Sequence, residues 1–282
     1  MSGATDLRPL PRPVEDGPVL AVIPARGGSQ GVPRKNLRDV AGRSLVGRAY
    51  DAARAATSVG HVVLSTEDAE IAAHGRSLGL DAVARPPELA DSTAPLEPTL
   101  LHASRALQTR FPHRWVVLLQ PTSPFRRAAD IDACVAAVRE RGASSGLSVV
   151  DAGITPAYLH HIADGRLERL YPDFPKGYRR QDFPPLYVPN GAVYVGHVSL
   201  LAEGVLIGPQ PAPVVMSTAR SFDLDSEEDF ARARWALERD PSLADSNAGR
   251  GADEQPRSLA DWVPRLHPSE RGADDAADDA AA

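Results

Sequence analysis

The sequence predicts an α/β fold in which a mostly parallel sheet has helices on both faces. Two observations carry this prediction: short apolar runs alternate with segments of helical periodicity, and the first run, residues 19–24, is apolar throughout. Uninterrupted apolar runs are typical of strands at the centre of a parallel sheet, where both faces are buried. In such sheets, ligands bind in the crevice outside the carboxyl ends of the strands.

The alternation of strand and helix continues to residue 150. Ser44 stands at the cap position of a helix over 44–56, and Asp68 caps the helix that follows a strand over 61–67. This order of elements favours βα units, in which successive strands lie parallel. Further strands are expected over 82–86, 115–121 and 146–150, and further helices over 98–109 and 128–140.

Beyond this point the pattern changes. The segment of about 151–190 is rich in proline and aromatic residues and lacks the alternation, so we interpret it as an excursion from the sheet. Strand patterns return over 191–198 and 213–218. Ser226 together with Asp229 then opens a final helix, which is expected to end at residue 239.

Composition predicts three regions. The chain has 282 residues, 43% of them hydrophobic and 24% charged, which suffices to bury a large core, expected over 18–239. A proline-rich leader over 1–17 and a tail over 240–282 are expected to be disordered. The tail contains ten acidic residues and four arginines, so the formal charge of −6 belongs to it and the remainder is neutral. A neutral body argues against nucleic acid as a partner.

The sequence also bears on the compartment. No apolar run is long enough to cross a bilayer and the start of the chain lacks the apolar stretch of a signal peptide, so we expect a cytoplasmic protein without a membrane partner. The single cysteine, Cys134, cannot form an internal disulfide and is expected to be buried.

The loop after the first strand reads ARGGSQGVPRKNL, residues 25–37. Clustered cations repel one another unless an anion lies among them, and glycines let backbone amides approach a ligand closely, so the loop predicts a polyphosphate site. Arg26 and Lys35 would hold phosphate oxygens from the two ends, with the amides of Gly27, Gly28 and Ser29 between them. A solvated basic turn is the alternative.

Two carboxylates, Asp223 and Asp225, precede the final helix. At a strand end, period-two alternation would direct both to one side, as a Mg²⁺ ion shared with substrate phosphates requires. A capping or turn role for the pair is the alternative. Gln120 and Arg85 each stand at the end of an expected strand, which is the ligand-binding edge of such a sheet. The alternatives are a rigid strand-to-helix turn at Gln120 and a surface arginine at position 85.

Four segments, taken in order, resemble the acylneuraminate cytidylyltransferases: residues 23–37, 118–126, 179–195 and 221–230. The resemblance implies a Rossmann-like nucleotidyltransferase fold whose excursion packs against a second subunit in a homodimer. It further implies that CTP and a sialic-acid-like nonulosonic acid react to give the CMP-sugar and pyrophosphate, with Mg²⁺ as cofactor.

The resemblance also assigns roles to individual residues. Arg26 and Lys35 become triphosphate ligands, Asp223 and Asp225 become magnesium ligands, and either Asp225 or a metal-bound water takes the proton of the attacking hydroxyl. The remaining assignments are Asn36 and Arg85 to the nucleotide, Gln120 to the acceptor, Arg180 to the acceptor's carboxylate, and Gln181 and Asn190 to the acceptor site.

This chain departs from the family pattern at several positions. Gln30 stands where many relatives have lysine, which leaves more of the neutralisation to Arg34 or to the metal, and Tyr158 stands near another expected lysine. Val205 and Leu206 occupy the region of an aromatic pair that often lines the sugar pocket. Alternatives to a nonulosonic acid are therefore another acidic acceptor, such as a different 2-keto sugar acid or a phosphonate, and a non-catalytic nucleotide-binding scaffold.

Overall fold

The computed structural model describes residues 17–28, 31–91, 94–171 and 184–246. The rest of the predicted leader and tail lies outside these ranges, and so do Ser29, Gln30, Arg180 and Gln181. The chain divides into two compact units. The first contains the residues up to Val150 together with Val188–Asp253, and the second contains Asp151–Tyr187.

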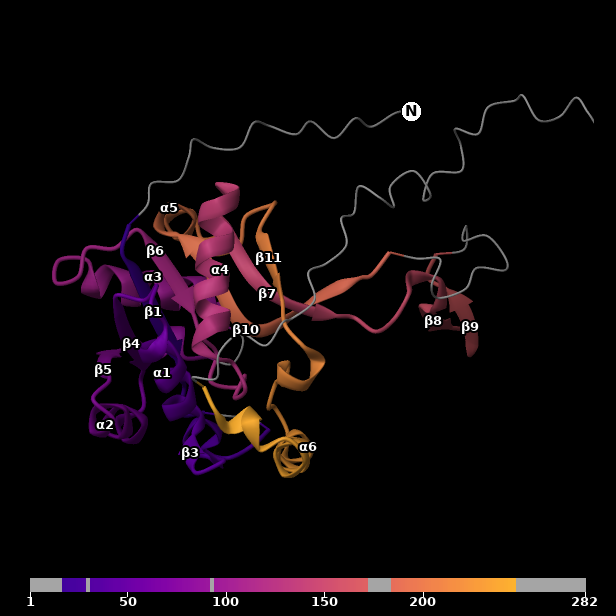
Figure 1. The fold of residues 1–282 in the computed structure, drawn as a ribbon, viewed down its shortest axis with the longest axis horizontal. Helices are drawn as coiled ribbons and strands as arrows, with labels where there is room; N and C mark the ends of the chain where they lie inside the picture. Colours follow the sequence, from indigo (N-terminus) through magenta and orange to yellow (C-terminus); the bar gives the residue numbers. More distant parts are fainter. Residues whose placement is uncertain (1–16, 29–30, 92–93, 172–183, 247–282) are drawn as a thin grey trace, which may run out of the picture. The chain divides into compact units, whose positions relative to one another are not determined.

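A seven-stranded sheet forms the first unit, with the order β11-β7-β10-β6-β1-β4-β5 (Figure 1). The pairs β1–β4, β1–β6, β4–β5 and β7–β11 are parallel, whereas β10 is antiparallel to β6. The predicted α/β fold with a mostly parallel sheet is confirmed. The strands are β1 (Val19–Pro24), β4 (His61–Thr66), β5 (Asp81–Ala84), β6 (Trp115–Leu118), β7 (Ser145–Asp151), β10 (Tyr187–His197) and β11 (Ala212–Val215).

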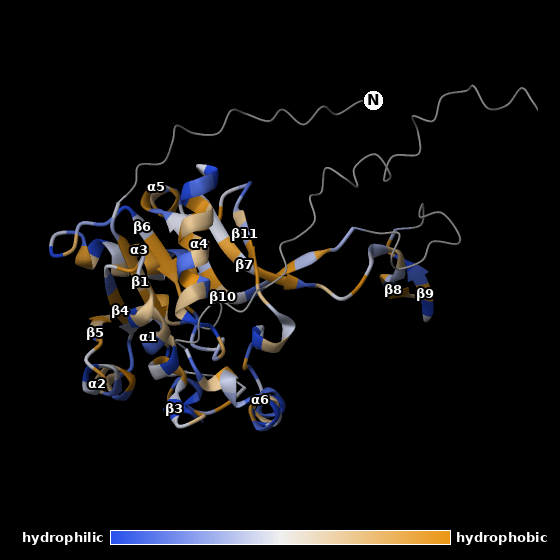
Figure 2. Ribbon diagram, viewed as in Figure 1, coloured by the Kyte–Doolittle hydropathy of each residue, from blue (hydrophilic) through white to orange (hydrophobic). Residues whose placement is uncertain are grey.

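Alternate residues of β1 pack against different helices because successive side chains of a strand point to opposite faces. Ala21 and Ile23 join a core with α1 (Leu45–Ala55) and α4 (Ala128–Arg141), and Cys134 is buried there as predicted. On the other face, Leu20 and Val22 join a core with α3 (Leu96–Leu107) and α5 (Val198–Ala202). Figure 2 shows apolar residues, in orange, along these central strands.

Three of the predicted helix starts are confirmed by their hydrogen bonds. Ser44 Oγ accepts from the Gly47 amide at 3.0 Å at the start of α1. Asp68 accepts from two amides at the start of α2 (Ala69–Ser77). Ser226 and Asp229 form the expected capping box at the start of α6 (Glu227–Arg239). These three signals are local in the sequence, so these helices begin where side-chain chemistry predicts. In contrast, α3 begins at Leu96, two residues before its predicted start, and has no side-chain cap.

A third apolar cluster lies beyond the sheet and brings together segments far apart in sequence. Val32 of the glycine-rich loop packs with Phe125, which follows β6, and with Leu224 and Phe230 at the start of α6. A short hairpin, β2 (Asp39–Val40) and β3 (Arg43–Ser44), adds to this cluster through Val40. The cluster therefore fixes the loop beside the acidic segment.

The packed structure continues past residue 239. Leu243, in a short helix over Pro241–Ala244, is 4% exposed within the third cluster. Buried Arg48 donates to the carbonyl oxygens of Leu243 and Ala244, both at 3.1 Å. The domain boundary predicted at residue 239 is therefore too early.

The second unit contains an antiparallel hairpin, β8 (His160–Ala163) and β9 (Arg166–Arg169), joined by a turn with positive φ at Asp164 and Gly165. Ile162 is 77% exposed and Leu167 69% exposed. The excursion from the sheet is thus present, while its role in a dimer stays a prediction.

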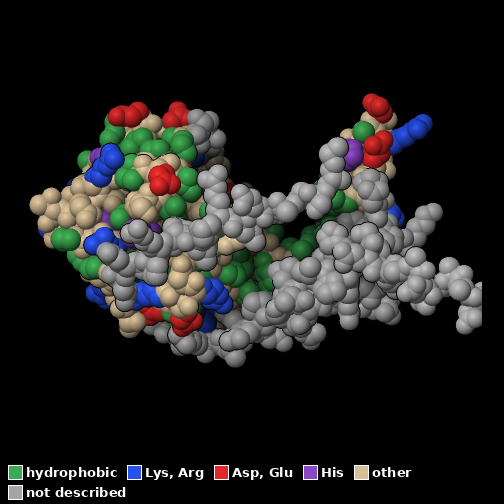
Figure 3. Space-filling model, turned by 90° about the horizontal axis from the view of Figure 1, so that it is seen from above, with side chains coloured by type: hydrophobic (Ala, Val, Ile, Leu, Met, Phe, Trp, Pro, Cys, Tyr) green, Lys and Arg blue, Asp and Glu red, His purple; other side chains and the backbone are tan. Residues whose placement is uncertain are grey.

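Charges on the first unit are mixed. Figure 3 shows acidic and basic side chains interspersed over the coloured part of one face. Among the described residues, no helix combines the length and apolar character that a bilayer span requires.

Replacing Leu243 with alanine is expected to lower the free energy of unfolding by about 2–5 kcal/mol, because it leaves a cavity in the third cluster. Denaturant unfolding measures this loss. The control is Ser242→Ala at the exposed neighbouring position, which should cost less than about 1 kcal/mol. Equal effects of the two changes would show that the segment does not pack on the body.

Candidate active site

The glycine-rich loop leaves β1 and closes on itself through a side chain. The amide of Ala25 donates to the Ser65 carbonyl at 3.0 Å, which extends the pairing with β4 by one residue. Buried Asn36 donates from Nδ2 to the Arg26 carbonyl at 2.9 Å. Asn36, predicted as a nucleotide contact, therefore ties together the two ends of the loop that carry Arg26 and Lys35.

The first glycine of the loop faces two carboxylates. The amide of Gly27 donates to Glu67 Oε1 at 2.7 Å. A Cβ atom at Gly27 would lie 2.3 Å from Asp68 Oδ2, so only glycine fits here without displacing that side chain. The loop amide thus points at a negative group, which is the orientation that phosphate binding needs.

Arg85 lies near this point and is influenced by the charge of Arg26. Arg85, just after β5, is 6% exposed, donates to the Ser65 carbonyl at 2.8 Å, and has its Nε 3.6 Å from Glu67 Oε2. Burial lowers the pKa of Arg85, Glu67 opposes this shift, and the nearby positive charge of Arg26 adds to it. The buried Nε has no hydrogen-bond partner among the described residues. An anion between the two arginines would relieve their repulsion.

Arg34 already has anionic partners. It donates to Asp68 at 2.6 and 3.1 Å and also contacts the Glu70 carboxylate. The hydrogen bond to Asp68 is the main cause that raises the pKa of Arg34 and lowers that of Asp68. Arg34 is therefore held against α2 by these carboxylates. Its expected role in compensating for the missing charge at position 30 stays a prediction.

Three contacts join the loop to the acidic segment near the end of the fold. Lys35 Nζ lies 2.7 Å from Asp225 Oδ1, across 190 positions of sequence. A Cβ atom at Gly31 would lie 2.3 Å from the backbone oxygen of Asp225, so the two backbones are in close contact. Arg38 donates to both carboxylate oxygens of Glu227, at 2.7 and 3.1 Å. The cationic loop and the acid pair therefore form one site.

The acid pair lies on an irregular segment and not at a strand end as predicted. Leu224 is buried and its amide donates to the Thr122 carbonyl at 2.9 Å, whereas Asp223 and Asp225 on either side of it are exposed. The buried Leu224 between the two exposed acids gives the same alternation of burial that a strand would give, while the shared direction of the two carboxylates stays a prediction.

The carboxylates are close enough to affect each other. The pKa of Asp223 is raised, first by desolvation from the surrounding protein and then by the negative charge of Asp225, while a hydrogen bond from Thr122 and the charge of Lys35 oppose the shift. Asp223 keeps an exposed surface, so ligands can reach it. Two exposed carboxylates fit Mg²⁺, which takes one or two protein ligands and completes its shell with water and phosphate. Among the described residues no cluster of three or more potential metal ligands exists.

Gln120, one of the predicted acceptor contacts, lies after β6 and faces the turn at Gly191. That glycine has φ of 78°, and a Cβ atom there would lie 3.0 Å from Gln120 Oε1 and 4.0 Å from Asp223 Oδ2. Arg126 donates from Nη1 to the carbonyl oxygens of Gln120 at 3.1 Å and Ala192 at 2.6 Å. Burial lowers the pKa of Arg126 to about 10, so it stays charged at neutral pH.

Asn190 uses its amide within the protein. Its Oδ1 accepts from Ser148 Oγ at 2.6 Å, and its Nδ2 donates to Ser221 Oγ at 2.9 Å and to Met216 Sδ at 3.3 Å. The predicted acceptor contact is therefore a buried junction of β7, β10 and the segment before Asp223. Sequence reasoning missed this positioning role, as it did for Arg126, because a motif does not reveal which residues are buried.

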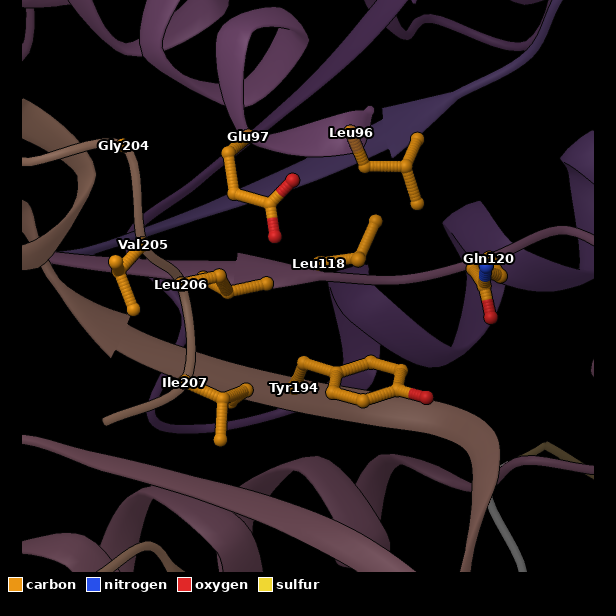
Figure 4. A pocket seen from close by; sticks show the side chains of 9 residues that line it. All are labelled: Leu96, Glu97, Leu118, Gln120, Tyr194, Gly204, Val205, Leu206 and Ile207. Atoms are coloured by element: carbon orange, nitrogen blue, oxygen red, sulfur yellow. The ribbon is translucent and has the colours of Figure 1, made fainter. Parts of the chain in front are cut away.

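A pocket of about 270 Å³ opens beside Gln120 (Figure 4). Burial, together with the charge of Asp223, raises the pKa of Tyr194. Gln120 and Asp223 both approach Gly191, which places the Gln120 end of the pocket next to the acid pair. Val205 and Leu206, where the resemblance put an aromatic pair, line it. The pocket is also lined by Leu96, Glu97, Leu118 and Ile207. No sequence pattern marks Glu97 as a pocket residue, because only the three-dimensional fold brings it there.

Comparison with known proteins agrees with this geometry. The cytidylyltransferase family model matches residues 20–198. The CMP-N,N'-diacetyllegionaminic acid synthase of Legionella pneumophila is 31% identical over 229 residues, which cover 78% of this chain and 96% of that protein. The N-acylneuraminate cytidylyltransferase of Streptococcus agalactiae is 28% identical over 214 residues, 75% of this chain and 51% of that protein. The chain thus spans about half the length of the streptococcal relative.

Solved structures share the fold. CMP:2-keto-3-deoxy-manno-octonic acid synthetase, solved with CTP, has a TM-score of 0.58 at 16% identity, covering 79% of this chain and 99% of that one. The 4-diphosphocytidyl-2C-methyl-D-erythritol synthase of Anaerococcus prevotii has a TM-score of 0.54 at 13% identity, covering 79% and 96%. The predicted nucleotidyltransferase fold and the resemblance to acylneuraminate cytidylyltransferases are confirmed, and the chain belongs to the cytidylyltransferase family of nucleotidyltransferases.

Proposed function

We propose that this enzyme joins CTP to a sialic-acid-like nonulosonic acid and releases pyrophosphate. The observation that carries the proposal is the 2.7 Å contact between Lys35 and Asp225, which brings the cationic loop and the acid pair into one site. The relatives support the choice of acceptor, since the two reported above are named for legionaminic and neuraminic acids.

The cations neutralise the triphosphate. CTP carries about four negative charges, and an anionic acceptor can approach its α-phosphate only when those charges are screened. Arg26, Lys35 and Arg85 supply positive charge, and the Gly27 amide supplies a backbone donor. Lys35 and Gly27 now bond to the carboxylates of Asp225 and Glu67, so each would exchange a protein oxygen for a phosphate oxygen when CTP binds.

Asp223 and Asp225 would hold the Mg²⁺ ion. When bound, the ion supplies further neutralisation of the phosphate charge. The acceptor's hydroxyl oxygen forms a bond to the α-phosphorus, the bond to the bridging oxygen breaks, and pyrophosphate leaves. Asp225 or a nearby water takes the hydroxyl proton.

Gln120 and Tyr194 would contact the acceptor in the pocket beside the acid pair. Arg180 and Gln181, proposed to bind its carboxylate and its surroundings, lie outside the described residues. We further propose a homodimer, because the hairpin of the second unit exposes Ile162 and Leu167, and a cytoplasmic location, as the sequence predicts. A different 2-keto sugar acid is the second candidate acceptor, favoured by Val205 and Leu206 where an aromatic pair is expected.

Pyrophosphate release with CTP, UTP, GTP and ATP tests the function against N,N'-diacetyllegionaminic acid, N-acetylneuraminic acid and 2-keto-3-deoxy-manno-octonic acid. CTP with one of the two acylated acids and Mg²⁺ should give the fastest release. The family match supports CTP as the nucleotide, and the two named relatives support an acylated acid as the acceptor. Preference for the octonic acid would favour the second candidate, and no CTP turnover with any acid would contradict the proposal.

Lys35→Ala should lower kcat/KM for CTP by about 10²-fold or more, since it removes a charge that the triphosphate needs. Its pair with Asp225 is partly exposed, so unfolding should change by less than about 1 kcal/mol. Arg38→Ala is the matched control, because Arg38 also pairs with the acidic end through Glu227. If both variants lost CTP turnover equally, Lys35 would have no specific role.

Asp225→Asn should lower turnover by at least about 10²-fold and weaken its dependence on Mg²⁺ concentration, while the protein stays folded because the side chain is 69% exposed. Initial rates across a magnesium titration measure both effects. Glu228→Gln, an exposed acid in the first turn of α6, is the control. Turnover near the unmodified level in Asp225→Asn would remove the metal role.

A further inference from the structure

The pocket beside Gln120 has two chemically different ends. Figure 4 shows the Tyr194 hydroxyl pointing toward Gln120. Gln120 Oε1 and Asp223 Oδ2 would lie 3.0 and 4.0 Å from a Cβ atom at Gly191, so this end of the pocket adjoins the acid pair. The other end is formed by the apolar segment Val205–Ile207 and by Glu97. An acceptor whose reacting hydroxyl lies near the acid pair would therefore place its distal substituents between Glu97 and that segment.

Glu97 is unusual among the pocket side chains. Its carboxylate is directed into the pocket and is half-buried (Figure 4). No hydrogen bond or ion pair joins it to another described residue, and none of the described side chains that line the pocket is basic. Glu97 lies in the first turn of α3, where the helix favours a negative charge. A half-buried carboxylate without a protein partner requires a donor from the ligand or from water.

The surroundings of Glu97 restrict what that donor can be. Val205, Leu206 and Ile207 offer no side-chain hydrogen bond, so a row of hydroxyl groups beside them would lose contacts with water. An acylamino group satisfies both walls, because its N–H donates to the carboxylate and its methyl group packs on the apolar segment. A phosphate or carboxylate at the same end would be repelled by Glu97.

We propose that Glu97 is a specificity-determining residue that accepts a hydrogen bond from an acylamino group at the distal end of the acceptor, with Val205–Ile207 holding the acyl methyl. The same carboxylate excludes acceptors with an anionic distal group. This inference rests on the proposed function, since it takes the pocket as the acceptor site.

Direct binding tests the role without requiring turnover. Titration calorimetry with CDP present gives the Kd of N,N'-diacetyllegionaminic acid, N-acetylneuraminic acid and N-acetylneuraminic acid 9-phosphate. Glu97→Gln should weaken binding of the diacetylated acid by about tenfold, because the glutamine oxygen can still accept the hydrogen bond but without the negative charge that strengthens it. The same change should also reduce the difference in Kd between the 9-phosphate and unphosphorylated N-acetylneuraminic acid. Glu140→Gln, an exposed glutamate on α4, is the matched control.

A second variant tests the apolar wall. Val205 is 40% exposed, so the Val205→Ser variant should fold normally. It should weaken binding of the diacetylated acid by about threefold to tenfold, and binding of N-acetylneuraminic acid by less. The inference would be overturned if the Kd values of all three acids changed equally in both variants, or if Glu97→Gln left them unchanged. If the unmodified protein binds none of the acids, the proposed function and the inference both fail. If it binds them and Glu97→Gln behaves like the control, only the inference fails.

Discussion

The site depends on holding the cationic loop against an acidic segment 190 positions away. The ionic contact between Lys35 and Asp225 cannot provide this alone, because exposed pairs contribute about 0–1 kcal/mol. The apolar cluster beneath it can: Leu224 and Phe230 are almost fully buried, and each such side chain contributes about 1.5–3 kcal/mol. The framework is therefore apolar and stable, while the polar contacts above it can exchange when a substrate arrives.

Several groups assigned to phosphate already face a carboxylate. The Gly27 amide and Arg85 lie against Glu67, and Lys35 lies against Asp225. A donor held at an anionic group needs little reorganisation to bind another anion, which is the basis of electrostatic preorganisation. Glu67 and Asp225 also limit the repulsion among the cations of the loop.

The parts that could be predicted from sequence are those with local signals. Caps such as Ser44 and Asp68 act on amides two or three residues away, and apolar runs identify central strands without knowledge of their neighbours. The antiparallel direction of β10 and the packing of Leu243 depend on contacts distant in sequence, so no local pattern predicts them. Glu97 shows the same limit, because only the fold places a first-turn glutamate of α3 in the pocket with Gln120.

The motifs also mix residues that can bind a ligand with residues that position others. Arg126 joins the carbonyl of Gln120 to that of Ala192, and the amide of Asn190 is used wholly within the protein. Burying a guanidinium or amide costs free energy unless hydrogen bonds satisfy its polar atoms. Once satisfied, these hydrogen bonds make the junction rigid. Because that junction holds Gln120 and Asp223 around Gly191, the distance between the acid pair and the Gln120 end of the pocket is fixed. In-line attack on a phosphate requires such fixed geometry.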